Sequence, residues 1–321
     1  MRPAQRPAIL VAMGTEASHP ARTAGRESDA APGTPAATRL QAAWLLSALI
    51  VALMAAASVG GLWIGGLYQD PAAVSARFRA SDLVTLAVAA PVLAVSLLAS
   101  RDGSPRAQLV WVAMLAYAVY SYAFYVFGTA FNDFFLLHVA LFSASLFALV
   151  FALAGIDAAG IGAHFRARTP VRGVSVFLAL LALSLGGIWS YNSLRFAVTG
   201  QPPEEAGLVG PIAGVHLAYV LDLSLLVPGY ALAAVLLWRR IGWGFVLATV
   251  LLASGVVLQL SYVAARAFQA DAQVAGATAF DPVEPLFVVG YVAATAVMLA
   301  NLTGAPTSRL TRLVRWPAGR R

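Results

Sequence analysis

The sequence contains neither cysteine nor lysine among its 321 residues. The absence of cysteine excludes disulfides, thiolate nucleophiles, zinc–thiolate sites and cysteine-ligated iron–sulfur clusters. The absence of lysine means that all 21 basic residues are arginine, which excludes a Schiff base, a lysine general base and the lysine of a phosphate-binding loop. Mechanisms that need a thiol or an amine nucleophile are therefore closed to this chain.

Charge is also scarce. Only 11% of the residues are charged, 60% are hydrophobic, and the mean hydropathy is +0.79, so the chain has about half the charge of a typical soluble domain. A soluble fold would expose large apolar patches, whereas lipid accepts the same side chains without penalty. The composition predicts an integral membrane protein.

The net charge of +7 and the isoelectric point near 10.1 would also suit a nucleic-acid-binding protein, but that function needs a basic face on a folded domain. The arginines instead lie beside the ends of long apolar runs. We therefore expect the lipid bilayer, and no nucleic acid, as the partner.

Eight apolar runs are each long enough to cross about 30 Å of hydrocarbon at about 1.5 Å per residue. They are Leu40–Tyr68, Leu83–Ser100, Leu109–Gly128, Phe134–Ile156, Val174–Val198, Val215–Trp238, Gly244–Phe268 and Leu286–Ala305. None shows the period-two alternation of a membrane β-barrel. The fold class is therefore all-α, a polytopic transmembrane helix bundle with eight spans.

The arginines predict the orientation. If both termini are cytoplasmic, 17 of the 21 arginines lie on the cytoplasmic side, and only Arg77, Arg79, Arg195 and Arg266 lie outside. Because cytoplasmic loops are enriched in basic residues, we expect this topology, with Asp70, Asp82 and six other acidic residues on the external side.

Two segments flank the transmembrane domain, which we place at 40–305. Residues 1–39 lack apolar periodicity and predict a disordered cytoplasmic segment; a signal peptide is the alternative, but its apolar core would be short. The start of translation is open between Met1 and Met13. Residues 306–321 predict a basic cytoplasmic tail suited to the anionic inner leaflet.

Two sets of matching residues suggest a duplication into two parallel four-helix repeats. Gly60-Gly61-Leu62-Trp63 matches Gly186-Gly187-Ile188-Trp189, and the order Asp82, Pro91, Arg101 is repeated as Asp222, Pro228, Arg239. Some transporters are built from parallel repeats. Chance is the alternative, because Gly, Pro and Leu are common in membrane sequences. Gly61-x-x-x-Gly65 is typical of close helix packing.

Asp222 is the most informative residue, because it lies about 10 Å inside the external start of the sixth span. A carboxylate at such a depth is costly and needs a cation or a proton. Arg195 and Arg266 lie near the external ends of the neighbouring spans, so we expect one of them to pair with Asp222. The alternative is that such a pair only locks two helices together.

Other polar residues are expected at the same depth, near the external ends of spans four to seven. They are His138, Asn192, His216, Tyr219, Gln259 and Tyr262. Together with Asp222 they predict an outward-facing polar cavity. The alternative is an interfacial aromatic belt, which would explain the tyrosines but not Asp222 or Gln259.

His138 and His216 raise the question of a metal or a bis-histidine haem. Two histidines without carboxylates at ligand spacing more often form hydrogen bonds, so we expect no metal and no cofactor. A serine hydrolase is disfavoured because the sequence has no Gly-x-Ser-x-Gly motif.

The block from Tyr120 to Asn132, with the pattern YxYxFYxFGxxFN, followed by residues 134–150, resembles an uncharacterised family of multi-pass bacterial membrane proteins. A weaker likeness extends over residues 220–243. The resemblance implies a location in the bacterial cytoplasmic membrane and carries no assigned activity, substrate or cofactor.

These observations favour a transporter-like or small-ligand-binding membrane protein with a polar or protonatable ligand near Asp222. The first alternative is a membrane-embedded enzyme that acts on a lipid or isoprenoid at the outer leaflet, with Asp222 and either His138 or His216 as acid and base. The second is a structural membrane subunit without catalysis. The substrate and the oligomeric state are not specified by the sequence.

Overall fold

The computed structural model describes residues 35–203 and 216–303, and within these ranges the chain is helical without a β-strand. The elements in chain order are α1 (Pro35–Trp63), α2 (Ala72–Val84), η1 (Thr85–Ala89), α3 (Ala90–Arg101), α4 (Pro105–Phe127), α5 (Phe135–Ala154), α6 (Ala158–Ala163), α7 (Val171–Thr199), α9 (His216–Leu221), η3 (Asp222–Leu226), α10 (Val227–Trp238), α11 (Gly242–Asp271) and α12 (Glu284–Asn301). Eight of the helices in these two ranges are long and apolar enough to cross a membrane. The predicted all-α fold with eight candidate spans is confirmed.

The second span is longer than predicted. We expected it at Leu83–Ser100, but the helix runs over Ala72–Arg101. The first ten residues of this span include Arg77 and Arg79, and Asp82 follows directly, so the segment has the composition of a loop. The error arises because hydropathy does not reveal that a polar side chain points into the protein.

Two of the spans contain a five-residue π-helical segment, η1 between α2 and α3 and η3 between α9 and α10. In both spans a proline, Pro91 or Pro228, follows two residues after the π-helical segment ends. Proline removes one helical hydrogen bond, and a π-bulge is a local break in the same ladder. Each of these spans therefore has a built-in irregularity near its middle.

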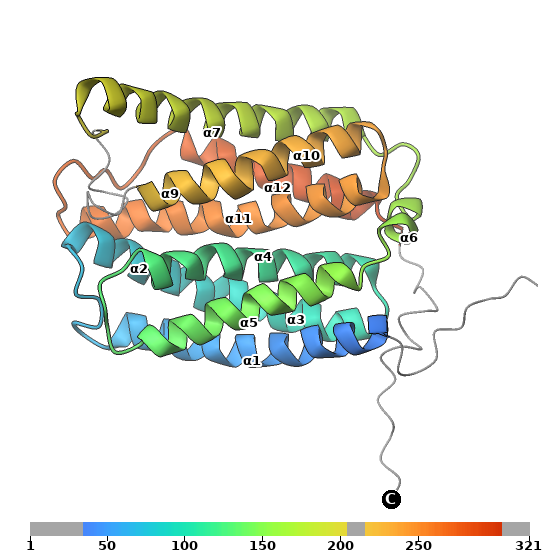
Figure 1. Ribbon diagram of the computed structural model, residues 1–321, viewed down its shortest axis with the longest axis horizontal. Coiled ribbons are helices and arrows are strands. Elements are labelled where there is room, and N and C mark those ends of the chain that lie inside the picture. The colour runs from blue at the N-terminus through green and yellow to red at the C-terminus, as the bar shows by residue number, and fades with distance from the viewer. Residues whose placement is uncertain (1–34, 204–215, 304–321) are drawn as a thin grey trace, which may run out of the picture.

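The spans form two groups, α1–α5 and α7–α12, which lie side by side in Figure 1. Within the first group α1 packs on α5, α5 on α4 and α4 on α3; within the second, α7 packs on α10, α10 on α11 and α11 on α12. The groups meet where α11 contacts α2 and α4. The groups correspond to the predicted halves, but the duplication itself stays a prediction.

The Gly-Gly-Trp blocks occupy different places in the two groups. Trp63 is the last residue of α1, whereas Trp189 lies well inside α7, which continues to Thr199. Both helices have 29 residues. Aligning the two helices end to end therefore does not place the two Gly-Gly-Trp blocks at the same position. The shared π-helical segments and prolines are the better support for a duplication.

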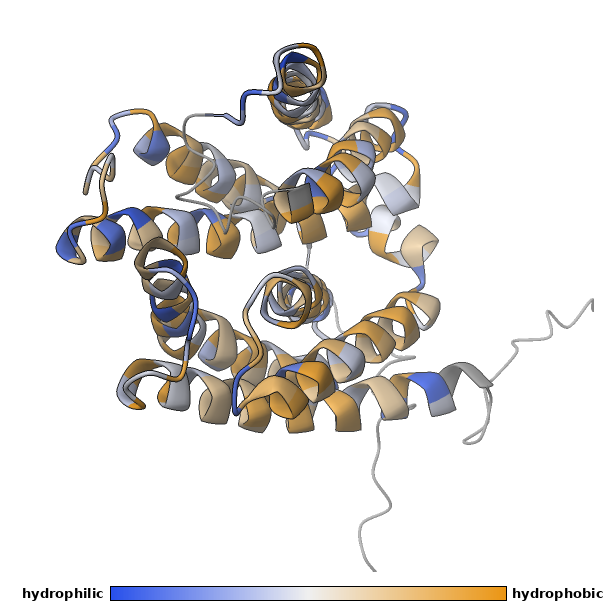
Figure 2. Cartoon of the chain, turned by 60° about the vertical axis from the view of Figure 1, so that its left-hand side comes forward, coloured by the Kyte–Doolittle hydropathy of each residue, from blue (hydrophilic) through white to orange (hydrophobic). Residues whose placement is uncertain are grey.

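Burial is uneven across the bundle. α4 is the most enclosed span, because 67% of its most apolar 18-residue stretch is buried inside the protein. The corresponding share for α12 is 17%. From Leu183 onward α7 is largely exposed, with apolar residues such as Leu194 and Val198 on its surface. In Figure 2 hydrophobic residues dominate the helices and hydrophilic residues gather mainly near their ends. Surfaces of this kind are suited to contact with lipid.

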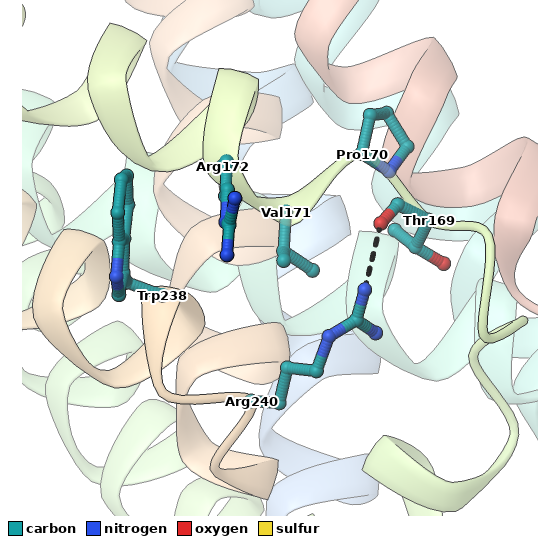
Figure 3. A pocket seen from close by; sticks show the side chains of 6 residues that line it. All are labelled: Thr169, Pro170, Val171, Arg172, Trp238 and Arg240. Carbon is teal, nitrogen blue, oxygen red and sulfur yellow. Dashed lines mark hydrogen bonds between the residues drawn. The ribbon is translucent and has the colours of Figure 1, made fainter.

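One end of the bundle collects arginines and is called here the arginine-rich end. It comprises the α3–α4 turn, the segment 155–172, the α10–α11 turn and the end of α12; Arg106, for example, donates to the carbonyl oxygens of Leu299 and Leu302. This end also contains an open pocket near Arg172 and Arg240 (Figure 3). The orientation of this end toward the cytoplasm stays a prediction from the basic-residue rule.

Candidate functional site

Asp222 is the first residue of the π-helical segment η3 and is 6% exposed. Its depth in the span was expected from the apolar run around it. The carboxylate is turned into the protein, as the cost of placing it in hydrocarbon requires. The partners that satisfy it come from two other spans.

Two aromatic residues donate hydrogen bonds to the Asp222 carboxylate. The Tyr120 hydroxyl from α4 donates to Oδ1, and Trp189 Nε1 from α7 donates to Oδ2 at 2.8 Å. The Trp189 ring stacks on Tyr219, with centroids 4.2 Å apart, and Asn192 Nδ2 donates to the Tyr219 hydroxyl at 3.3 Å. Three predicted residues, Asp222, Tyr219 and Asn192, thus belong to one network, and sequence reasoning missed Tyr120 and Trp189 as members.

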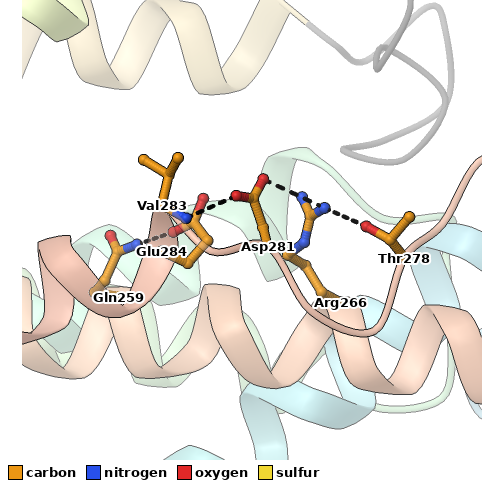
Figure 4. A network of polar contacts seen from close by, with 6 residues as sticks. All are labelled: Gln259, Arg266, Thr278, Asp281, Val283 and Glu284. Carbon is orange, nitrogen blue, oxygen red and sulfur yellow. Dashed lines mark hydrogen bonds and ion pairs between the residues drawn. The ribbon is translucent and has the colours of Figure 1, made fainter.

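The expected ion pair between Asp222 and Arg266 or Arg195 is not formed. Arg266 instead pairs with Asp281 at 3.6 Å and donates to Thr278 at 2.6 Å (Figure 4). Arg195 is exposed on the outer part of α7. The prediction was wrong because the α11–α12 connection folds back over Arg266 and supplies a carboxylate that is closer than Asp222.

Arg77 of α2 supplies the positive charge that acts on this network. It lies within electrostatic range of the Asp222 carboxylate, and its guanidinium carbon lies 4.7 Å from the centroid of the Phe124 ring. Because α2 belongs to the other group of spans, this attraction crosses the boundary between the two groups. We missed Arg77 because we placed it in an external segment.

The residues of the predicted polar face of α11 have different neighbours. Gln259 Nε2 donates to a carboxylate oxygen of Glu284 at the start of α12 (Figure 4). Tyr262, one turn further along, is 37% exposed and lies within electrostatic reach of Arg77. Gln259 therefore joins α11 to α12 rather than bonding to Asp222.

A second buried carboxylate, Asp82 of α2, is 1% exposed. The Tyr68 hydroxyl donates to its Oδ2 at 2.6 Å, and the Tyr125 hydroxyl donates to its Oδ1 at 2.9 Å. Tyr68 lies between the first two spans, and burial together with the charge of Asp82 raises its pKa, so it remains a protonated donor at neutral pH. We had expected Asp82 on the external side of the membrane, and the structure places it inside the bundle.

Gly61 allows α1 to approach this second carboxylate. A Cβ atom at Gly61 would lie 1.9 Å from Asp82 Oδ2 and 2.5 Å from the Tyr68 hydroxyl oxygen, whereas a Cβ at Gly65 would meet nothing within 4 Å. The motif Gly61-x-x-x-Gly65 therefore has one close contact rather than two, and that contact is with the Asp82 network.

The histidines do not join Asp222 in any contact of the described side chains. His138 is fully buried, and neither of its ring nitrogens has a hydrogen-bond partner in the described part of the chain. Its ring centroid lies 4.8 Å from that of Tyr125 and 6.3 Å from that of Tyr122, so it borders the Asp82 network. His216 begins α9, and its side chain lies outside the described residues.

Metal binding has no support in the described ranges, where no group of three or more His, Cys, Asp or Glu residues could hold an ion. The chemistry that the two networks offer is proton binding and hydrogen bonding. Each has one carboxylate, two aromatic donors and the positive charge of one arginine, which is Arg79 for Asp82 and Arg77 for Asp222.

Comparisons with known proteins assign no family, since no family model, curated protein or solved structure matches this chain. The resemblance carried by the block from Tyr120 to Asn132 therefore stays a prediction. Two members of that block, Tyr120 and Tyr125, are the α4 donors to Asp222 and Asp82. The case for function depends on this geometry.

Proposed function

We propose that this integral membrane protein is a transporter that binds a proton or a small protonatable ligand at Asp222. The observation that carries the proposal is a buried carboxylate held by donors from two other spans, with an arginine charge from the opposite group of spans nearby. Ionisable groups inside a membrane domain commonly mark ion or substrate pathways. Eight apolar helices support the membrane assignment.

Tyr120 and Trp189 are neutral donors, so they orient the carboxylate without cancelling its charge. The attraction between Asp222 and Arg77 acts between the two groups of spans. Protonation of Asp222, or binding of a cationic ligand to it, weakens that attraction and changes the balance between two packings of the groups. The π-helical segment and Pro228 provide a weak point at which the sixth span can bend.

We further propose that the protein resides in the bacterial cytoplasmic membrane with both termini in the cytoplasm. The support is the distribution of arginines along the sequence and the family resemblance. An outward-facing cavity around Asp222 belongs to the same proposal, because a transported ligand needs a path from the side opposite the arginine-rich end.

An enzyme acting on lipid is less well supported. The acid–base pair proposed for it requires either His138 or His216 beside Asp222. His138 lies beside Tyr125 in the Asp82 network instead, and the side chain of His216 lies outside the described residues. A structural subunit remains the competing account, because both carboxylates also hold helices together. The two accounts differ in what happens when Asp222 loses its charge but keeps its shape.

The experiment is proton flux into liposomes that contain the full chain and a pH-sensitive dye. Under an imposed proton gradient, the wild type and Asp133→Asn, a control at an exposed acid, should admit protons faster than protein-free liposomes, and Asp222→Asn should not. Equal rates for Asp222→Asn and the wild type, or a wild type no faster than empty liposomes, would contradict the proposal.

A further inference from the structure

A pocket of about 480 Å³ opens at the arginine-rich end, between the start of α7 and the end of α10 (Figure 3). Its lining residues are Thr169, Pro170, Val171, Arg172, Trp238 and Arg240. The set contains two arginines and no acidic residue. It lies at the other end of the bundle from the external connection at Asp70, and the function proposed for Asp222 does not use it.

Arg172, in the first turn of α7, is exposed, and its guanidinium carbon lies 5.7 Å from the centroid of the Trp238 ring. Trp238 ends α10 and is 52% exposed. An exposed indole at the end of a membrane span is typical of the headgroup level of the bilayer. The neighbouring guanidinium offers a planar array of donors that matches phosphate oxygens.

Arg240, in contrast, forms hydrogen bonds to the backbone of the protein. It donates to the carbonyl oxygens of Ala167 at 3.0 Å and Thr169 at 3.2 Å, and its backbone adopts a positive φ of 55°. It therefore fixes the segment before α7 while adding positive charge to the pocket. Within the described ranges the ion pair found is Arg266–Asp281, so no acid neutralises either pocket arginine.

Apolar surface continues from the pocket toward the middle of the spans. Val176 lies one turn after Arg172 on α7 and is 48% exposed, and Val235 lies one turn before Trp238 on α10 and is 51% exposed. Both residues share a helix face with the pocket residue beside them. A free anion would not contact this apolar surface, whereas the acyl chains of a phospholipid would cover it.

We infer that this pocket binds the phosphate group of an anionic phospholipid, with Arg172 as the principal contact, Arg240 as a supporting charge and Trp238 against the glycerol region. Charge complementarity favours an anionic lipid over a zwitterionic one, because each basic residue near an anionic membrane surface adds binding energy. The site is independent of Asp222 and stands or falls separately from the transport proposal.

The test measures thermal unfolding of the full chain in non-ionic detergent micelles, alone and with added phosphatidylglycerol, phosphatidylcholine or inorganic phosphate. A ligand that binds the folded state raises the unfolding temperature. We compare the wild type with Arg172→Gln, the conservative Arg172→Lys, and Arg168→Gln, a control at an exposed arginine outside the pocket lining. Arg172 is exposed, so its replacement should leave the fold intact.

Phosphatidylglycerol should raise the unfolding temperature of the wild type and of Arg168→Gln, with an apparent affinity about fivefold weaker in Arg172→Gln. Arg172→Lys should fall between them, because it keeps the charge and loses the planar donors. The inference is overturned if Arg172→Gln and Arg168→Gln respond alike, if phosphatidylcholine stabilises equally, or if inorganic phosphate alone reproduces the shift.

Discussion

Trp189 Nε1 of α7 donates a 2.8 Å hydrogen bond to Oδ2 of Asp222, which joins an exposed outer helix to the buried acid of the sixth span. The outer part of α7 has few other polar contacts with the bundle. A bond to a charged acceptor is stronger than a neutral one. This bond is therefore the main polar link that positions the outer part of α7.

The first prediction concerns that bond. Trp189→Phe keeps an aromatic ring against Tyr219 but removes the donor, so the folded state should lose about 1–3 kcal/mol. Trp63→Phe is the control, because Trp63 is 71% exposed at the end of α1 and its replacement should change stability by less than about 0.5 kcal/mol. Detergent-induced unfolding followed by circular dichroism measures both values; equal losses for the two variants would show that the bond contributes nothing.

A second prediction concerns two glycines, Gly61 in α1 and Gly65 in the turn after it. Gly61→Ala places a methyl group against Asp82 Oδ2 and the Tyr68 hydroxyl, so it should cost about 1–3 kcal/mol through overpacking. Gly65→Ala meets open space and should be close to neutral. The comparison of their thermal unfolding temperatures checks the approach of α1 to Asp82, which would be refuted by a stable Gly61→Ala variant.

A third prediction tests the charge of Arg77 across the group boundary. Arg77→Gln and Asp222→Asn should each destabilise the protein, and the double variant should lose less than the sum of the two, with a coupling energy of about 0.5–3 kcal/mol. The same cycle with Arg79 in place of Arg77 is the control, since Arg79 donates to the Leu62 carbonyl oxygen and acts on Asp82 rather than Asp222. Additive losses for Arg77 and Asp222 would remove the proposed switch.

A fourth prediction concerns the orientation of the protein in the membrane. Because the sequence contains no cysteine, a single introduced cysteine is the one thiol of the chain that can react. Single cysteines at Arg168, at the arginine-rich end, and at Asp133, in the connection between α4 and α5, should react with a membrane-impermeant maleimide from opposite sides of the membrane in intact cells and inverted vesicles. We expect Asp133→Cys to react from outside and Arg168→Cys from inside. The reverse pattern would invert the orientation inferred from the arginines.

The eight spans were predictable because runs of apolar residues long enough to cross a bilayer can be recognised directly in the sequence. The depth of Asp222 followed from the same run. Its partners did not, because Tyr120 and Trp189 are 102 and 33 residues away in sequence and their apolar neighbours make them look like packing residues. Pairwise contacts between spans depend on helix rotation, which periodicity along one helix does not specify.

Asp82 was missed for the opposite reason. Arg77, Arg79 and Asp82 crowd the first ten or so residues of the second span, so the segment looked too polar for a membrane. In the structure Asp82 is satisfied by Tyr68 and Tyr125, and Arg77 lies against Phe124. The repeated order Asp, Pro, Arg in the two halves was the one available signal, since it already matched Asp82 with Asp222.

The central claim is that Asp222 binds a proton inside the membrane domain. Infrared difference spectroscopy of the full chain in lipid tests it directly, by recording the carboxylic acid C=O band that appears when the pH is lowered. Because Asp82 is also buried and can contribute a band of its own, we predict a buried-acid component that is present in the wild type, in Asp133→Asn and in Asp82→Asn and is missing from Asp222→Asn. An unchanged band in Asp222→Asn, or no such band in the wild type, would contradict the account.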